Sequence, residues 1–304
     1  MNIAVSRKAM NDAFEVTYPR DEYPQGTAAA LDALDEVERI ESKLSVFRFG
    51  SRIQYVNLTA HEAPVHLDDE LFALISLCRQ IAEDTGGAVD VTSGKLWKIW
   101  GFAQRDGRIP TDDELRTARS CTGYHLLELD TEEKTVRFKK AGVELNFGCV
   151  GKGFALDIAT AKLAQHGVGR YLFQGGLSSI LAKGDWNIGI AHPLLAGERL
   201  QELPLNNTAV STSGSQKQYF RYNGKRYSHL LDPRSGEPAA GVLSVTVTAP
   251  TAVLAELLST AFFVFGPEKT QEYIDSCSDI TAVMCVPEKQ APGFSVHRYA
   301  AAEH

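Results

Sequence analysis

The sequence predicts an α+β protein: a single compact unit with mixed antiparallel sheets and flanking helices. Helical and strand-like segments are interspersed along the 304 residues, without the regular alternation of a doubly wound parallel sheet. No Pro- or Ser-rich linker, low-complexity segment or internal repeat divides the chain. We therefore expect residues 1–304 to form a single domain.

Apolar residues recurring three and four positions apart predict the helices. The first covers residues 27–44, where Leu34, Val37 and Ile40 share one face. Glycine and proline mark the ends of several others. The remaining helices are expected over residues 69–84 (ended by Thr85-Gly86-Gly87), 112–120 (entered through Pro110-Thr111), 153–166 and 252–265 (ended by Gly266-Pro267).

Alternating or continuous short apolar runs predict the strands. In the first, residues 9–19, Phe14, Val16 and Tyr18 alternate onto one face. The others are expected at residues 124–129, 135–139, 143–147, 170–174, 178–183, 186–191, 217–222, 242–248 and 280–286. Because several follow one another without an intervening helix, antiparallel pairing is favoured.

Composition and charge exclude several classes of function. The chain is 44% hydrophobic and 23% charged, with a net charge of −7 and no block of like charges. We therefore expect neither a nucleic-acid groove nor a polybasic membrane surface. A protein of this charge that binds a polyphosphate needs a metal ion or helix amides to offset the repulsion.

Cysteine spacing and the absence of long apolar runs predict a cytoplasmic protein. The five cysteines include no Cys-x-x-Cys pair, so we expect reduced, mostly buried thiols. They are Cys78, Cys121, Cys149, Cys277 and Cys285. The N-terminal residues lack the apolar run of a signal peptide, and no stretch approaches the length of a membrane span.

A glycine-lysine segment at residues 146–157 is a candidate phosphate-binding loop. Gly151, Lys152 and Gly153 stand where a strand leads into a helix, which directs amide N–H groups and an ammonium toward an anion. The spacing differs from that of a Walker loop, and a simple turn explains the glycines equally well.

Three other segments combine turns with polar side chains. In residues 86–92, two glycines precede Asp90, which could accept hydrogen bonds from a ligand; a helix end leading into a strand is the alternative. Residues 174–179 hold a glycine pair that a β-bulge also explains. In residues 228–236, a tight Asp-Pro-Arg-Ser-Gly turn follows His229 and could present its imidazole to a ligand, although a surface histidine is the alternative.

The apolar helix over residues 252–265 holds two oxygen-bearing side chains on one face. Glu256 and Thr260 are four residues apart, and burying them is costly unless a partner satisfies them. Such a pair suits a hard cation such as Mg²⁺. An exposed polar stripe is the alternative, but the apolar neighbours leave little polar surface.

These segments, in this order, resemble the FAD:protein FMN transferase (ApbE) family. The matching runs are residues 86–102, residues 146–157, Thr212-Ser213-Gly214, Ser228-His229-x-x-Asp232-Pro233 and the Glu256/Thr260 helix, within 10–286. The resemblance implies a T-fold-like architecture that binds FAD with Mg²⁺. It also implies transfer of FMN to a threonine of a target flavoprotein through a phosphoester bond, with release of AMP.

The resemblance further implies roles for individual residues. His229 is the expected catalytic base and Lys152 is expected to hold phosphate oxygens. Mg²⁺, or Mn²⁺ as the alternative, is expected on the Gly151 carbonyl, Glu256 and Thr260. The positions expected to contact FAD are Met10, Phe47, Ala88, Val89, Asp90, Gly148, Phe154, Leu230 and Ser259.

The chain departs from the family pattern at several positions. Glu256 and Asn146 stand where Asp is usual, Leu177 follows Gly175-Gly176 in place of Asp, and Asn11-Asp12 follows Met10 in place of Gly-Thr. Two other functions therefore stay open: an FAD pyrophosphatase that forms FMN and AMP, and a non-catalytic FAD-binding protein.

Overall fold

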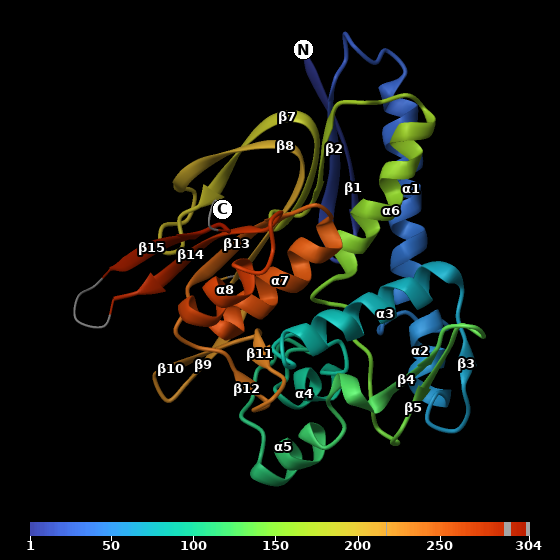
Figure 1. Cartoon of the computed structure of the whole chain (residues 1–304), viewed down its shortest axis with the longest axis vertical. Helices are drawn as coiled ribbons and strands as arrows, with labels where there is room; N and C mark the ends of the chain where they lie inside the picture. Colours follow the sequence, from blue (N-terminus) through green and yellow to red (C-terminus); the bar gives the residue numbers. More distant parts are fainter. Residues whose placement is uncertain (217, 289–292, 302–304) are drawn as a thin grey trace.

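The largest element of the computed structural model, which describes residues 1–216, 218–288 and 293–301, is an eight-stranded sheet (Figure 1). Its order is β1-β2-β6-β7-β8-β13-β14-β15, and each neighbouring pair is antiparallel. The strands are β1 Asn2–Ala9, β2 Asp12–Pro19, β6 Tyr171–Gly175, β7 Ser179–Ala191, β8 Arg199–Gly214, β13 Ser244–Ala249, β14 Thr281–Pro287 and β15 Phe294–Tyr299.

Three helices carry much of the core: α1 Gly26–Leu44, α6 Gly151–Gln165 and α7 Ala252–Phe265. Helix α1 packs on α6, α6 packs on α7, and α7 packs on β8 and β13. The buried face of α1 includes Ala29, Ala30 and Ala33, small side chains that permit close helix contact. Helix α7 is buried on almost all sides, as its continuous apolar sequence requires.

A mainly helical region lies beside α6 and α7 (Figure 1). It consists of α2 Arg52–Thr59, α3 Asp69–Asp84, α4 Gly94–Ile99, α5 Asp112–Arg119, the 3₁₀ turn η1 Tyr124–Leu126, and a small sheet of β3 Val65–His66, β5 Thr135–Phe138 and β4 Leu127–Asp130. Later in the chain come the hairpins β9 Tyr219–Tyr222/β10 Lys225–Ser228 and β11 Leu231–Asp232/β12 Glu237–Pro238, then α8 Pro267–Ile274.

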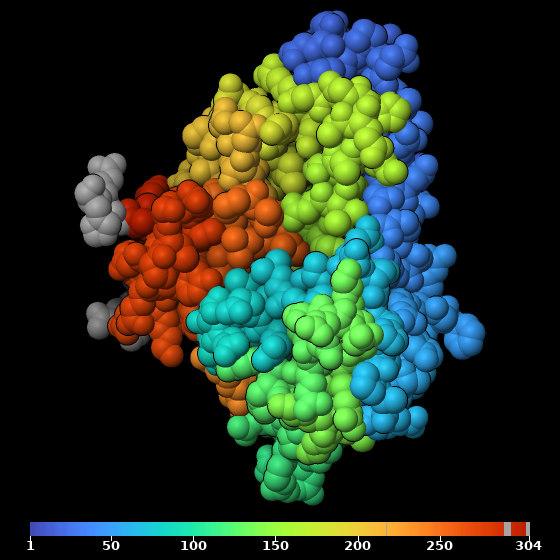
Figure 2. Space-filling model, turned by 45° about the vertical axis from the view of Figure 1, so that its right-hand side comes forward, coloured from blue at the N-terminus to red at the C-terminus, as the bar shows by residue number. Residues whose placement is uncertain are grey.

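One cluster of buried side chains runs through both regions. It includes Leu74 of α3 and Val136 of β5 together with Phe173 of β6 and Phe262 of α7. In Figure 2 the surfaces of the α6, α3 and C-terminal segments meet in the middle of the visible face. The predicted fold class, α+β with antiparallel sheets and flanking helices in one compact unit, is confirmed. Among the described residues, no helix combines the length and apolarity needed to cross a bilayer.

Three predicted strands form with different bounds because the backbone turns or bulges. The predicted strand 9–19 begins too early: Asp12–Pro19 forms β2, whereas Met10 and Asn11 have φ of 50° and 61° and connect β1 to β2. Conversely, predicted strands 178–183 and 186–191 form one strand, β7, with an irregularity between Ala182 and Asp185. Asn11 suits this turn because asparagine tolerates the left-handed conformation better than most residues do.

The predicted strand 143–147 forms only an isolated bridge, between Ser93 and Glu144. Its backbone is satisfied by other groups: Asn57 Nδ2 donates to the Leu145 carbonyl at 3.0 Å, and the Leu145 N–H donates to Asn57 Oδ1 at 2.8 Å. A side chain therefore replaces the neighbouring strand.

Other predicted boundaries also move. Predicted strand 124–129 begins as η1, and of predicted strand 217–222, residue 217 lies outside the described residues while 219–222 forms β9. Several elements were not predicted: β1, α2, β3, α4, β8, β10, β11, β12, α8 and β15.

Candidate metal and cofactor site

The glycine-lysine segment forms the start of α6. The Gly151 N–H donates to the Phe147 carbonyl at 2.7 Å, which closes the turn into the helix. Two residues later, a Cβ on Gly153 would lie 2.4 Å from the Ala252 carbonyl oxygen. Only glycine therefore lets α6 contact the first turn of α7 so closely.

This contact places an amide beside the carboxylate of Glu256. The Gly153 N–H donates to Oε2 at 2.7 Å, and the Ser179 hydroxyl of β7 donates to Oε1. Lys152 Nζ lies 3.5 Å from the same Oε1. Because the Glu256 side chain is only 4% exposed, the carboxylate depends on these partners in place of water.

Hydroxyl groups surround the next turn of α7. Ser213 Oγ of β8 lies 2.9 Å from Ser259 Oγ and 3.3 Å from Thr260 Oγ1. The Ser259 hydroxyl also lies 3.2 Å from Ser211 Oγ and 3.1 Å from the Glu256 carbonyl oxygen. Ser259, predicted to contact FAD, is thus fully buried within a hydrogen-bonded group.

Asp157 of α6 fixes the other end of the helix contact. Its carboxylate accepts hydrogen bonds from the N–H groups of Ala252 and Val253, at 2.9 and 2.8 Å, and so caps α7. Burial raises the Asp157 pKa to about 6; the two hydrogen bonds oppose this shift, and the charge of Glu256 adds to it. Helices α6 and α7 are therefore joined through two carboxylates.

His229 follows β10 and precedes the turn that Gly236 closes. Its N–H and its Nδ1 contact the Gln218 carbonyl oxygen at 3.1 and 3.0 Å. Burial lowers the His229 pKa, the Gln218 carbonyl opposes that shift, and the positive charge of Lys152 lowers the pKa further. Assigning the proton to Nδ1 from this hydrogen bond leaves Nε2 as the group able to accept a proton near pH 7.

Asp90 connects the 86–92 segment to the same region. Its Oδ1 accepts hydrogen bonds from the Thr92 N–H and hydroxyl at 2.8 and 2.7 Å, and burial raises its pKa. The pKa of Cys149 is raised to about 12, first by burial and then by the charges of Glu256 and Asp90. Both carboxylates therefore lie within electrostatic range of this thiol.

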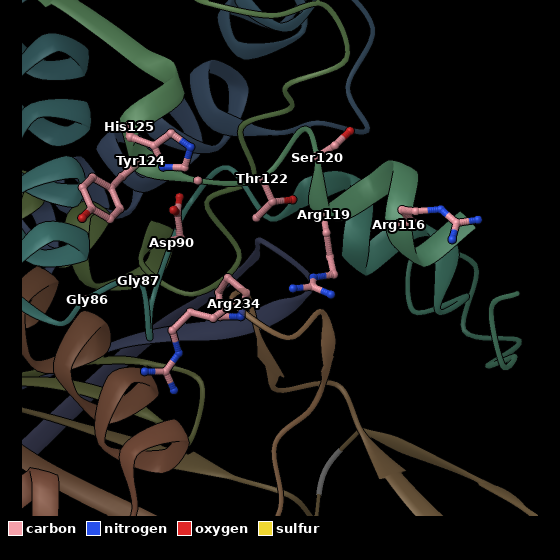
Figure 3. Close-up of a pocket in the computed structure, with 12 residues that line it drawn as sticks. Gly86, Gly87, Asp90, Arg116, Arg119, Ser120, Thr122, Tyr124, His125 and Arg234 are labelled. Atoms are coloured by element: carbon pink, nitrogen blue, oxygen red, sulfur yellow. The ribbon is translucent and has the colours of Figure 1, made fainter. Parts of the chain in front are cut away.

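A cavity of about 480 Å³ opens beside Asp90. Figure 3 shows Asp90, Tyr124 and His125 near one another, and Arg116 and Arg119 on α5. Arg234, from the turn after His229, also lines the cavity and pairs with Asp232 through two nitrogens at 2.8 Å. Of the predicted site residues, only Asp90 lines this cavity; Glu256, Lys152 and His229 do not.

The other predicted cofactor positions are distributed over several elements. Ala88 and Val89 are buried in the core, as are Phe154 of α6 and Leu230. Phe47 is 62% exposed and packs edge-on against Trp97, with ring centres 6.2 Å apart. Met10 occupies the β1–β2 turn, and the exposed Gly148 donates its N–H to Asn146 Oδ1 at 2.8 Å.

The site also depends on residues for which no role was predicted: Ser179, Ser211, Ser213 and Asp157. The spacing of Ser211 and Ser213, two residues apart on one strand, was the available signal that they share a face. Among the described residues, no group of at least three His, Cys, Asp or Glu side chains could hold a metal ion. A metal site here must therefore include hydroxyl or main-chain oxygens.

The chain is similar in sequence to a known protein family. The sequence model of the ApbE family matches residues 10–284. An FAD:protein FMN transferase of Haemophilus influenzae is 32% identical over 288 residues, covering 89% of this chain and 82% of the relative. The Escherichia coli protein of that name is 31% identical over 255 residues, covering 80% and 71%.

Solved structures show the same fold. The ApbE protein of Thermotoga maritima superimposes with a TM-score of 0.88 at 27% identity, covering 98% of this chain and 97% of the other. The apo form of the flavinyl transferase ApbE from Pseudomonas stutzeri gives 0.86 at 29% identity, covering 98% and 95%. The similarity therefore includes both the helical region and the large sheet.

Proposed function

The chain belongs to the ApbE family, from which we infer that it is a flavin transferase that moves FMN from FAD to an acceptor protein. We further propose that the acceptor is a threonine of a target flavoprotein, that AMP is released, and that residues 1–304 act as a single FAD-binding transferase domain. The relatives named FAD:protein FMN transferase support this proposal, since they match most of the chain.

The chemistry of the donor groups fits Mg²⁺, with Mn²⁺ as the alternative. The Glu256 carboxylate, the Thr260 hydroxyl and the Gly151 carbonyl are the hard oxygen ligands that such ions prefer. The carboxylate is buried, and its cationic neighbour Lys152 stands at 3.5 Å, longer than a hydrogen bond. When bound there, the metal would neutralise charge on the diphosphate of FAD.

The chain's own residues would carry the proton and bind the phosphates. His229 Nε2 would take the proton from the threonine hydroxyl as that oxygen attacks the phosphorus of the FMN part of FAD. A phosphoester bond forms, and the bond from that phosphorus to the bridging oxygen breaks, so that AMP leaves with the oxygen. Lys152 would hold phosphate oxygens during the transfer.

One observation carries the proposal: the buried Glu256 carboxylate lies beside Lys152 and the start of α6, while the same lysine influences His229. The residues proposed as metal ligand, phosphate-binding cation and base are thereby within range of one another, which supports phosphoryl-type transfer. The remaining predicted contacts, Met10, Phe47, Ala88, Val89, Asp90, Gly148, Phe154, Leu230 and Ser259, are proposed to hold FAD.

The cysteines support a proposed cytoplasmic location and a cytoplasmic acceptor. All five lie within the described residues and are free thiols, with Cys78, Cys121 and Cys285 buried. Free thiols persist in a reducing compartment. Fractionation of cells that produce the protein would test the location, and recovery of the protein from an oxidising compartment would contradict it.

The proposed reaction is tested by incubating the protein with FAD, Mg²⁺ and a candidate acceptor flavoprotein, then mapping acceptor peptides by mass spectrometry. FMN on a threonine is the expected product. His229→Gln should abolish it while retaining FAD binding, which equilibrium titration would check. Unchanged transfer by His229→Gln would remove His229 from the role of base.

A further inference from the structure

Serine hydroxyls form a polar strip on the sheet face that packs against α7. Ser179 of β7 stands opposite Ser211 of β8 in the antiparallel register. Ser213 lies two residues further along β8, so its side chain points to the same face as that of Ser211. Ser179 and Ser211 are buried, and each hydrogen-bonds to a residue of α7.

The direction of the hydrogen bonds in this strip follows from proton counting. The Ser259 hydroxyl has one proton, and the Glu256 carbonyl oxygen at 3.1 Å can only accept it. The geometry of the Ser213–Ser259 contact, at 2.9 Å, permits either hydroxyl to donate; we assign the Ser259 proton to the Glu256 carbonyl, so that Ser259 accepts from Ser213. If Ser259 donates to Ser211 Oγ instead, at 3.2 Å, Ser259 likewise accepts from Ser213.

This direction fixes the state of Thr260. The single proton of Ser213 is used on Ser259, so the contact of 3.3 Å between Ser213 and Thr260 requires Thr260 to donate. Thr260 Oγ1 then presents only lone pairs to its other neighbours. A hydroxyl in this state suits a cation, because its proton points away from the ion.

We propose that Ser213 is a positioning residue: it orders the Thr260 proton so that the Thr260 oxygen can bind the metal. This inference rests on the metal site of the proposed function. Ser179 orients the other ligand, Glu256, because its hydroxyl donates to Oε1 and limits rotation of the carboxylate. The serine strip thus acts on the metal through the two side-chain ligands of α7, as supporting hydrogen bonds commonly do.

The test is the affinity for Mn²⁺ of the FAD-free protein, measured from the electron paramagnetic resonance signal of free Mn²⁺. Ser213→Ala should weaken binding about tenfold, the factor expected for losing one partly buried hydrogen bond. Ser213→Thr, which keeps a hydroxyl, should restore most of the affinity. Thr212→Ala is the matched control: Thr212 is the adjacent residue on β8, its side chain lies on the opposite face, and the variant loses a hydroxyl contact of the same length, 2.9 Å to Thr246 Oγ1.

The ordering role is overturned if Ser213→Ala binds Mn²⁺ as tightly as the wild type, or if Thr212→Ala weakens binding by the same factor. Circular dichroism melting shows whether each variant is folded. If Ser213→Ala does not fold, the Mn²⁺ affinity of Ser213→Thr decides the test. A wild-type protein that binds no Mn²⁺ refutes the metal site and this inference together. Mn²⁺ binding without FMN transfer would instead refute only the proposed reaction.

Discussion

Lys152 Nζ lies 3.5 Å from Glu256 Oε1, although the two residues are 104 positions apart on different helices. The pair exists because Gly153 lets α6 approach the first turn of α7. At this distance, the ammonium stabilises the buried carboxylate without forming a short hydrogen bond. Lys152 can therefore turn toward a phosphate when another cation takes its place.

Glu256→Gln is expected to abolish metal binding and FMN transfer. The amide keeps the size of the side chain but removes the charge that attracts both Lys152 and a cation. One amide hydrogen would also face a donor, so we expect a loss of about 1–3 kcal/mol in the free energy of unfolding. Metal titration and urea denaturation measure the two effects. Glu272→Gln on the exposed face of α8 is the control, and equal losses in both variants would contradict the account.

Gly153→Ala is expected to destabilise the protein far more than Gly151→Ala, although both lie in the first turn of α6. The new methyl group at residue 153 would meet the backbone of Ala252 and Val253, whereas at residue 151 the nearest atoms are 3.9 Å away. We expect a cost of about 1–3 kcal/mol for the first, as for other overpacked sites. Thermal denaturation of both variants tests this; similar melting temperatures would show that α6 and α7 separate freely.

The pH dependence of transfer should reflect His229. Burial and Lys152 lower its pKa, so the imidazole is neutral at pH 7 and the rate should fall only as the pH drops below 6.5. Lys152→Met should move this acidic limb to higher pH, because a charge that disfavours the imidazolium is removed. Rates with saturating FAD between pH 5 and 8 provide the measurement. An acidic limb that stays in place in Lys152→Met would mean that another group controls the rate.

Asp157 should make the folded protein more stable as the pH falls from neutrality. Its pKa is raised from 3.8 to about 6, so between these values the folded state binds more protons than the unfolded state. The unfolding free energy contributed by this group therefore rises as the pH decreases through that window. Urea denaturation of the wild type and of Asp157→Asn, at pH 4.5 and at pH 7, isolates the contribution of Asp157 to the free energy of unfolding. We expect the wild type to gain stability relative to the variant at pH 4.5; a difference independent of pH would contradict the shift.

The sequence predicted best where one signal decides the structure. The apolar run at residues 252–265, ended by Gly266-Pro267, coincides with α7 Ala252–Phe265 because a helix so apolar is buried on nearly all sides. Strand β8 was not predicted because Pro204 and the pair Asn206-Asn207 interrupt the apolar pattern of its sequence. Its pairing with β7 and β13 decides its structure, and such long-range partners are not visible in a local window.

The residues of the site likewise divide into those that the local sequence identifies and those that depend on long-range pairing. Glu256 and Lys152 could be selected because a carboxylate in an apolar helix and a lysine between glycines are locally unusual. Ser179, Ser211 and Ser213 could not, because serine is common in strands and their role depends on the register between β7 and β8. The φ of Met10 likewise depends on the hairpin pairing of β1 with β2.

The ratio of AMP released to FMN bound covalently to the acceptor tests the central claim most directly. Both products can be quantified in one reaction with FAD and Mg²⁺, by chromatography for AMP and by intact mass for the acceptor. We expect a ratio of one, with a threonine as the modified residue and no turnover by Glu256→Gln. AMP and free FMN in equal amounts, without modified acceptor, would contradict it and identify water as the nucleophile.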